Sequence, residues 1–225
     1  MIKVFFIRHG QSTANANPFE SLKTDDNWAV SLTLKGMDQA NELGKSWKHK
    51  PYAVYISPYT RTQETEWHFM SGANILDTEY YRFIDSRIRE RTTQRHDGLY
   101  EEVRGLAKMT SAKQYFYKSP HMESMCEVCD RANNFIDHLA SADYPSNSNI
   151  LVFTHRHFME AVQMVMDQKL RSKPVLFRPS NYDKVDRIEN CQVLAYVLHN
   201  NTSADKYTYE FKSEQSDTKM CTHLD

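Results

Sequence analysis

The chain contains few of the residues that usually separate domains or mark special environments. Its 225 residues include only 6 glycines and 7 prolines, so long linkers are not expected. The net charge is -1 at pH 7, and nothing in this balance indicates nucleic acid or an anionic membrane as a partner. No apolar run approaches the length of a membrane span, and the opening MIKVFF lacks the features of a secretory leader. We therefore expect a cytoplasmic protein.

Cysteine is also scarce, with four residues in the whole chain. Cys126 and Cys129 form a C-x-x-C pair, which in other settings is a redox pair or half of a zinc site. A redox pair requires a strand-to-helix turn, and a zinc site requires a second pair of ligands at a fixed spacing. This pair lies within a helical pattern and no second pair accompanies it. Ordinary reduced helix cysteines are predicted.

What remains is a pattern of alternating strands and helices. Apolar runs rich in β-branched and aromatic residues predict strands. These runs cover residues 2–7, 53–57, 73–83, 149–155, 191–199 and 206–211. Apolar positions at helical spacing predict helices over residues 32–49, 58–70, 124–140 and 158–167. Thr33 is a predicted N-cap, and Pro58 is placed in the first turn of its helix.

This alternation predicts an α/β fold, a three-layer α/β/α sandwich with a mostly parallel central sheet. The polar and charged stretch 85–120 is predicted to form a lobe of loops and short helices over the active site. Residues 1–211 would form a single domain, and the polar tail 212–225 would be loosely held.

Charged side chains follow two of the predicted buried strands. Arg8 and His9 follow the first, and His155 follows Thr154 on another. Ser57 and Arg61 lie at a third strand-to-helix junction. Because ligands bind outside the carboxyl ends of parallel strands, these junctions are expected at one edge of the sheet.

Side chains of these types favour a phosphate site. Arginine presents a permanently charged planar fork that matches phosphate oxygens, and Gly10 lets the backbone approach a ligand closely. A neutral histidine in this setting can attack phosphorus and carry the phosphoryl group. Phosphoryl transfer needs mainly positioning and charge neutralisation, which arginines supply without a metal. No cofactor is expected.

Six segments resemble, in order, the motifs of the histidine phosphatase superfamily, whose fold is shared with the cofactor-dependent phosphoglycerate mutases. The segments are RHGQSTAN (8–15), SLTLKGMDQA (31–40), ISPYTRTQET (56–65), SRIRER (86–91), VFTH (152–155) and ENCQVLAYVL (189–198). The resemblance therefore runs from residue 1 to about residue 211. In addition, YFYKSPHMESMCEVCDR (115–131) resembles a stretch of the broad-range acid phosphatase branch, which points away from the mutases.

The resemblance implies a role for individual residues. His9 would be the nucleophile that forms a phosphohistidine, and Glu90 would be the proton donor, which needs a raised pKa. His155 would be protonated or would donate a hydrogen bond to a phosphate oxygen. The residues implied to contact the phosphoryl group are Arg8, Asn15, Arg61 and His155.

Three carboxylates are alternatives to Glu90, namely Asp85, Glu101 and Glu102. They lie in the same charged stretch of the sequence.

The sequence departs from the family pattern in two places. The family usually has a glycine after the second histidine, whereas this chain has Arg156 and His157. Arg156 is therefore a candidate substrate contact. After SRIRER the family often has a short aromatic-glycine step, whereas TTQRHDGLYEE is longer and more polar, with Gly98 as the candidate displaced glycine. Both departures bear on substrate choice.

The resemblance implies a metal-independent phosphatase that hydrolyses phosphomonoesters, with a small phosphorylated metabolite as its substrate. A phosphoglycerate mutase would use the same phosphohistidine and return the phosphoryl group to a bound phosphoglycerate. A catalytically silent domain that binds phosphorylated ligands is the third reading. The natural substrate and the oligomeric state do not follow from the sequence.

Overall fold

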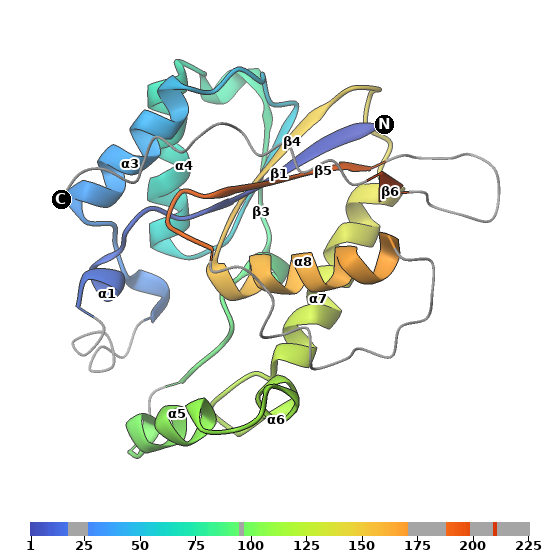
Figure 1. The fold of residues 1–225 in the computed structure, drawn as a ribbon. Helices are drawn as coiled ribbons and strands as arrows, with labels where there is room; N and C mark the ends of the chain where they lie inside the picture. Colours follow the sequence, from blue (N-terminus) through green and yellow to red (C-terminus); the bar gives the residue numbers. More distant parts are fainter. Residues whose placement is uncertain (18–26, 95–96, 171–187, 199–208, 211–225) are drawn as a thin grey trace.

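The protein is built on one six-stranded sheet (Figure 1). The structure is a computed structural model that describes residues 1–17, 27–94, 97–170, 188–198 and 209–210. The strands are β1 (Ile2–Arg8), β2 (Ala53–Ile56), β3 (Tyr81–Ile84), β4 (Asn149–Thr154), β5 (Val193–Leu198) and β6 (Tyr209–Glu210). Their order across the sheet is β3-β2-β4-β1-β5-β6.

The four strands β3, β2, β4 and β1 are parallel, and β5 and β6 continue the sheet in antiparallel fashion. β4 lies between β2 and β1, and its burial from Ile150 onward explains its continuous apolar run. In the register of β1 and β4, Arg8 lies opposite Thr154. The residues that follow these strands, His9 and His155, therefore leave the sheet at the same edge, as predicted.

Two pairs of helices cover the two faces of the sheet (Figure 1). The helices α3 (Leu34–Lys45) and α4 (Thr60–Ala73) pack on one face, and α7 (Met125–Ser141) and α8 (Arg156–Leu170) pack on the other. One core cluster centres on Phe69 and Phe153, and the second on Phe6, Phe135 and Phe158. The predicted three-layer α/β/α sandwich is confirmed.

The predicted N-cap of α3 agrees with the structure. The Thr33 side chain accepts a hydrogen bond from the Gly36 amide at the start of α3. Ser124 and Glu127 form a capping box at the start of α7. Pro58 lies before the Tyr59 N-cap of α4 and not in the first turn, which corrects the predicted start of this helix.

The predicted strand over residues 73–83 is wrong in its first part. Ala73 is the last residue of α4, and Asn74 ends that helix in the left-handed conformation. A 3-10 helix, η2 (Asp77–Glu79), follows, so that only the end of the segment joins β3. The apolar residues of this segment belong partly to a helix end and partly to an edge strand. The apolar pattern alone does not distinguish these two environments.

Two short helices, α5 (Leu99–Ala107) and α6 (Ser111–Phe116), form the predicted lobe (Figure 1). The lobe is closed at its base, where Thr93 pairs with Met122 and the Gln94 amide donates to the His121 carbonyl oxygen. Gly98 begins α5 with a φ of 99°, a conformation that favours glycine. The remaining short elements are α1 (Thr13–Ala16), η1 (Asn27–Ala29) and η3 (Ser86–Ile88).

Cys126 and Cys129 lie on α7 as free thiols, in agreement with the sequence prediction. Within the described ranges, no helix is long and apolar enough to cross a membrane. Only residues 209–210 of the predicted strand 206–211 are described. The tail 212–225, which contains Cys221, lies outside the described residues.

The first turn of α3 packs directly on the backbone that follows His9. A Cβ atom on Gly36 would lie 2.1 Å from the Gln11 carbonyl oxygen, and one on Gly10 would lie 2.3 Å from the Gly36 carbonyl oxygen. Thr33 adds a backbone hydrogen bond of 2.9 Å to the same Gln11 oxygen. Helix α3 and the loop after β1 are therefore fixed to one another.

We expect Gly36→Ala to lower the free energy of unfolding by about 1–3 kcal/mol, because neither backbone can yield to the added methyl group. Chemical denaturation measures this change. Gly105→Ala is the matched control, because a Cβ there meets no atom within 4 Å and alanine favours the helix. Equal stability of the two variants would contradict the close contact.

Candidate active site

His9 is held in the tautomer that a nucleophile needs. Its Nδ1 lies 2.7 Å from the Gly10 carbonyl oxygen, which can only accept, so Nδ1 carries the proton. Nε2 therefore keeps its lone pair, and the Nε–H of Arg61 donates to it at 3.3 Å. Burial, Arg61 and Arg8 together hold the pKa of His9 well below its ordinary value. The imidazole is neutral near pH 7.

Two buried arginines stand beside this imidazole. Arg8 is 7% exposed and Arg61 is 4% exposed. Arg8 donates to the Ile188 carbonyl oxygen at 2.7 Å, while its Nε has no partner among the described residues. Burial lowers the pKa of both guanidinium groups, which is the cost of removing their charge from water. An anion bound between them would offset that cost.

His155 is fully buried, and its ring centroid lies 5.2 Å from that of His9. Its Nε2 lies 2.8 Å from the Ser57 hydroxyl oxygen, and its Nδ1 has no hydrogen-bond partner in the described part of the chain. Burial and Arg61 hold the pKa of His155 well below its ordinary value. Of the two predicted forms, the free protein favours a neutral ring that donates a single proton.

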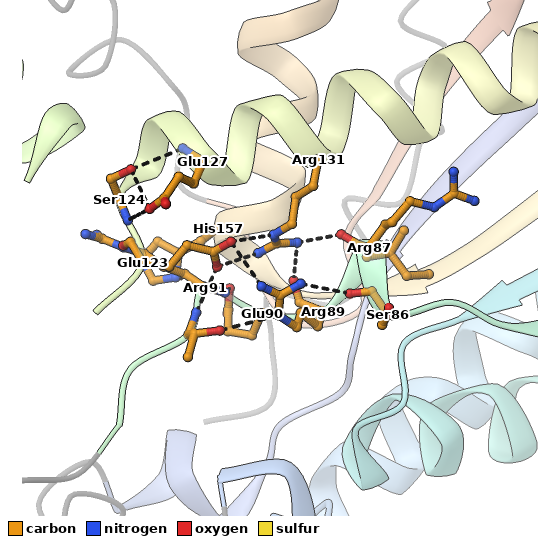
Figure 2. A network of polar contacts seen from close by, with 12 residues as sticks. Ser86, Arg87, Arg89, Glu90, Arg91, Glu123, Ser124, Glu127, Arg131 and His157 are labelled. Carbon is orange, nitrogen blue, oxygen red and sulfur yellow. Dashed lines mark hydrogen bonds and ion pairs between the residues drawn. The ribbon is translucent and has the colours of Figure 1, made fainter. Parts of the chain in front are cut away.

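Glu90 lies at the same site. Its Oε1 accepts from the Arg91 amide at 2.8 Å and lies 3.2 Å from Nδ1 of His157 (Figure 2). Burial acts to raise the pKa of Glu90, but His157, followed by His155 and Arg61, outweighs it. The resulting pKa lies well below the ordinary value.

The expectation of a raised pKa at Glu90 is therefore wrong for the free protein. His157, His155 and Arg61 favour the charged form of the carboxylate and outweigh burial, which alone would raise its pKa. A bound phosphate group would add negative charge beside Glu90 and neutralise part of the arginine charge. Such binding would shift the pKa of Glu90 upward, toward the value a proton donor needs.

The three alternative carboxylates lie elsewhere. Asp85 forms an ion pair with Arg87, whose Nη2 is 2.5 Å from Oδ2. Glu102 accepts from the Tyr117 hydroxyl at 2.8 Å within the lobe, and Glu101 is exposed on α5. Of the four candidates, the structure brings Glu90 to the two histidines.

A buried ion pair fixes the segment that carries Glu90 (Figure 2). The Glu123 carboxylate accepts from Arg89 at 3.2 Å, from Arg131 at 2.9 Å and from the Thr92 amide at 3.1 Å. Arg131, on α7, also donates to the carbonyl oxygens of Arg87 and Arg89 at 2.6 and 2.7 Å. Residues 87–92 are thus tied to the helical layer and not to the lobe.

Asn15, on the short helix α1, is an exposed residue at the rim of the site. Its Oδ1 accepts from the Ser12 amide at 3.2 Å and from Asn190 at 3.1 Å. The same Asn190 amide donates to the His9 carbonyl oxygen at 2.9 Å. Asn190, three residues before β5, therefore contacts both His9 and Asn15.

Arg156 is the first residue of α8 and is also at the rim. Its Nη2 donates to Nε2 of His157 at 3.0 Å, and its Nε lies 3.5 Å from Oε1 of Glu160. Burial is the largest cause of the lowered pKa of Arg8. Glu90 acts to raise this pKa, and the charge of Arg156 acts to lower it, so the two cations act on one another. Burial raises the pKa of Glu160.

Four residues at the site carry no assigned role in the sequence analysis. Ser57, Tyr59 and Asn190 lie within motifs of the family resemblance, so the sequence indicated that they lie near the site. The Tyr59 ring contacts both His155 and Arg61. Glu160 lies outside those motifs, and only the packing of α8 brings it to the site.

The sequence profile of the histidine phosphatase superfamily, branch 1, matches residues 4–178. The phosphoglycerate mutase-like protein AT74H of Arabidopsis thaliana is 25% identical over 181 residues, which are 68% of this chain and 61% of that protein. The chain thus spans less than two thirds of that relative. A 2,3-bisphosphoglycerate-dependent phosphoglycerate mutase of Protochlamydia amoebophila is 24% identical over 74% of this chain and 86% of its own length.

Solved structures share the fold at low sequence identity. A mycobacterial glucosyl-3-phosphoglycerate phosphatase superposes with a TM-score of 0.64 and 18% identity, over 94% of this chain and 98% of that one. A phosphoserine phosphatase variant from Entamoeba histolytica gives a TM-score of 0.64 and 18% identity, over 88% and 92%. These relatives include both mutases and phosphatases, and they give no specific support to the acid phosphatase branch. From its strand-end histidines and the profile that spans them, the chain belongs to branch 1 of the histidine phosphatase superfamily.

Proposed function

We propose that this protein is a metal-independent phosphatase that hydrolyses phosphomonoesters through a phosphohistidine on His9. The observation that carries the proposal is the fixed tautomer of His9. The Gly10 carbonyl oxygen, 2.7 Å from Nδ1, accepts the Nδ1 proton. The Nε2 lone pair is then directed toward Arg61. A neutral imidazole beside buried cations is a nucleophile beside an anion site.

The first half-reaction forms the phosphohistidine. Nε2 of His9 attacks phosphorus, the bond from phosphorus to the ester oxygen breaks, and Glu90 gives its proton to the departing oxygen. A phosphate monoester that enters as its monoanion brings the proton that Glu90 needs. Arg8 and Arg61 hold the equatorial oxygens, and neutral His155 donates from Nδ1 while Ser57 donates to its Nε2.

The second half-reaction returns the site to its starting state. Water attacks the phosphohistidine, Glu90 now takes a proton from that water, and the bond from phosphorus to Nε2 breaks. Glu90 then passes that proton to the departing inorganic phosphate, so its carboxylate is ionised again, as in the free protein. A phosphoglycerate mutase would place a bound phosphoglycerate hydroxyl where this water stands.

Small phosphorylated metabolites are the proposed substrates. The relatives of known structure are named for glucosyl-3-phosphoglycerate and phosphoserine, and one is a complex with 3-phosphoglyceric acid. We propose Asn15 and Arg156 as further substrate contacts at the rim, because both lie beside the buried cations. The stretch 115–131, which resembles the broad-range acid phosphatases, supports a broad range of esters, and a panel of phosphorylated metabolites tests that range.

The decisive test measures ester hydrolysis, phosphoglycerate interconversion and vanadate binding by the purified protein. We expect hydrolysis of p-nitrophenyl phosphate in the presence of EDTA. Faster interconversion of phosphoglycerates, dependent on a bisphosphate primer, would assign the protein to the mutases. Vanadate binding with no turnover of either substrate would assign it to the silent phosphate-binding domains and would overturn the proposal.

A further inference from the structure

We propose that His157 is a positioning residue that holds the Glu90 carboxylate at the phosphate pocket through its Nδ1–H, and that Arg156 fixes His157 for this task. The proposal deepens the proposed function and rests on it where turnover is concerned. It concerns the position at which the chain departs from its family, where two large polar residues follow the second histidine.

The contact between His157 and Glu90 is local and specific. Nδ1 of His157 lies 3.2 Å from Oε1 of Glu90, and their side chains are 26% and 16% exposed (Figure 2). Nδ1 is buried and, among the described residues, has no aligned hydrogen-bond acceptor, Glu90 included. The contact of 3.2 Å is an ion-pair distance at which a hydrogen bond forms once the N–H points at the carboxylate.

Arg156 sets the direction in which His157 donates. A guanidinium group can only donate, so Nε2 of His157 accepts from Arg156 at 3.0 Å and must carry a lone pair. The ring therefore carries its proton on Nδ1, which faces Glu90. Glu160 lies behind Arg156 at 3.5 Å and completes a polar chain from the first turn of α8 to the proton donor.

Other titratable groups also act on Glu90 and must be separated from His157 in any test. They are Arg8 at the end of β1 and His9 after it, Tyr59 and Arg61 at the start of α4, His155 after β4, and Glu160 on α8. Arg61 and His155 act on Glu90 in the same direction as His157, so each is kept in the variants below. The same Oε1 also accepts from the Arg91 amide at 2.8 Å.

The first experiment is independent of turnover. The pKa of Glu90 is measured by NMR in protein labelled with ¹³C at the glutamate carboxyl carbon, with Glu90→Gln identifying the resonance. We expect His157→Ala to raise this pKa by about one unit or more, because the side chain that lowers it most is lost. His157→Asn retains a donor near the Nδ1 position and should keep the pKa close to the wild-type value. His68→Asn, a histidine exchange on α4 beside Trp67, is the matched control.

The second experiment uses the leaving group as a probe. An alkyl phosphate needs a proton on its departing oxygen, whereas the p-nitrophenolate ion leaves without one. We expect His157→Ala to lower kcat about 10-fold on the alkyl ester and less than about 3-fold on the aryl ester. The alkaline limb of the kcat profile should move to higher pH, because activity that requires protonated Glu90 is lost only above its raised pKa. His157→Asn should recover most of the alkyl activity.

The outcomes separate the two proposals. An unchanged pKa of Glu90 in a folded His157→Ala protein overturns the positioning role, whatever the turnover. A raised pKa supports it even where the wild type hydrolyses neither ester, a result that overturns only the proposed function. Equal losses on the two esters would identify His157 as merely structural.

Discussion

His9→Ala is expected to abolish the hydrolysis of every phosphomonoester, with a loss of about 10⁴-fold or more. The substitution removes the only atom placed to attack phosphorus in the proposed mechanism, while Arg8, Arg61 and His155 remain. The variant should therefore still bind vanadate or inorganic phosphate. Steady-state assays with p-nitrophenyl phosphate and with an alkyl phosphate measure the loss, and a thermal-shift titration with vanadate measures binding.

A chemical trap makes the test of His9 sharper. Rapid acid or alkaline quenching of the wild type with labelled substrate should leave a phosphoryl group that is labile in acid and stable in base, as a phosphohistidine is. The His9→Ala variant should show none. His68→Ala, away from the site, should match the wild type. Undiminished turnover by folded His9→Ala protein would refute the mechanism.

Glu90→Gln has the second largest expected effect. We expect kcat on an alkyl phosphate to fall by about 10²–10⁴-fold, the usual contribution of a general acid, with a smaller loss on p-nitrophenyl phosphate. Glutamine preserves the shape of the side chain but cannot deliver a proton. The limb of the kcat profile that falls as pH rises through the pKa of bound Glu90 should disappear from the variant.

The control for this prediction comes from the lobe. Glu101 is an exposed carboxylate on α5 and was an alternative to Glu90 on sequence grounds. Glu101→Gln should leave both the rate and its pH profile unchanged. An unaltered pH profile in Glu90→Gln would instead move the proton donor to another group, and Glu160 would be the next to test, since burial raises its pKa.

The strand ends could be predicted because their signal is local. The apolar run of β1 stops at Arg8 and that of β4 stops at Thr154, and the parallel register then brings His9 to His155 without further information. The ambiguity over residues 73–83 was also local, since the left-handed Asn74 and the turn at Glu79 leave no mark in the apolar pattern. The fold therefore followed from the sequence, except at the start of α4 and in the segment between its end and β3.

The electrostatics of the site could not be predicted in the same way. The sequence places Glu90 between Arg89 and Arg91 in a charged stretch, and it does not show that His157, His155 and Arg61 approach the carboxylate in the folded chain. The direction of the pKa shift depends on which of these neighbours approach within a few ångströms. Only the packing of α4 and α8 against the sheet decides that.

The closed base of the lobe has a consequence for how this protein can change over evolutionary time. The chain leaves the body at Thr92 and returns at Glu123, where the Glu123 amide donates to the Thr92 carbonyl oxygen at 2.9 Å. The lobe between them is thus an excursion whose two ends already meet. We therefore expect insertions, deletions or an exchanged segment at this neck to leave the contacts of residues 87–92 with Glu123 and Arg131 in place.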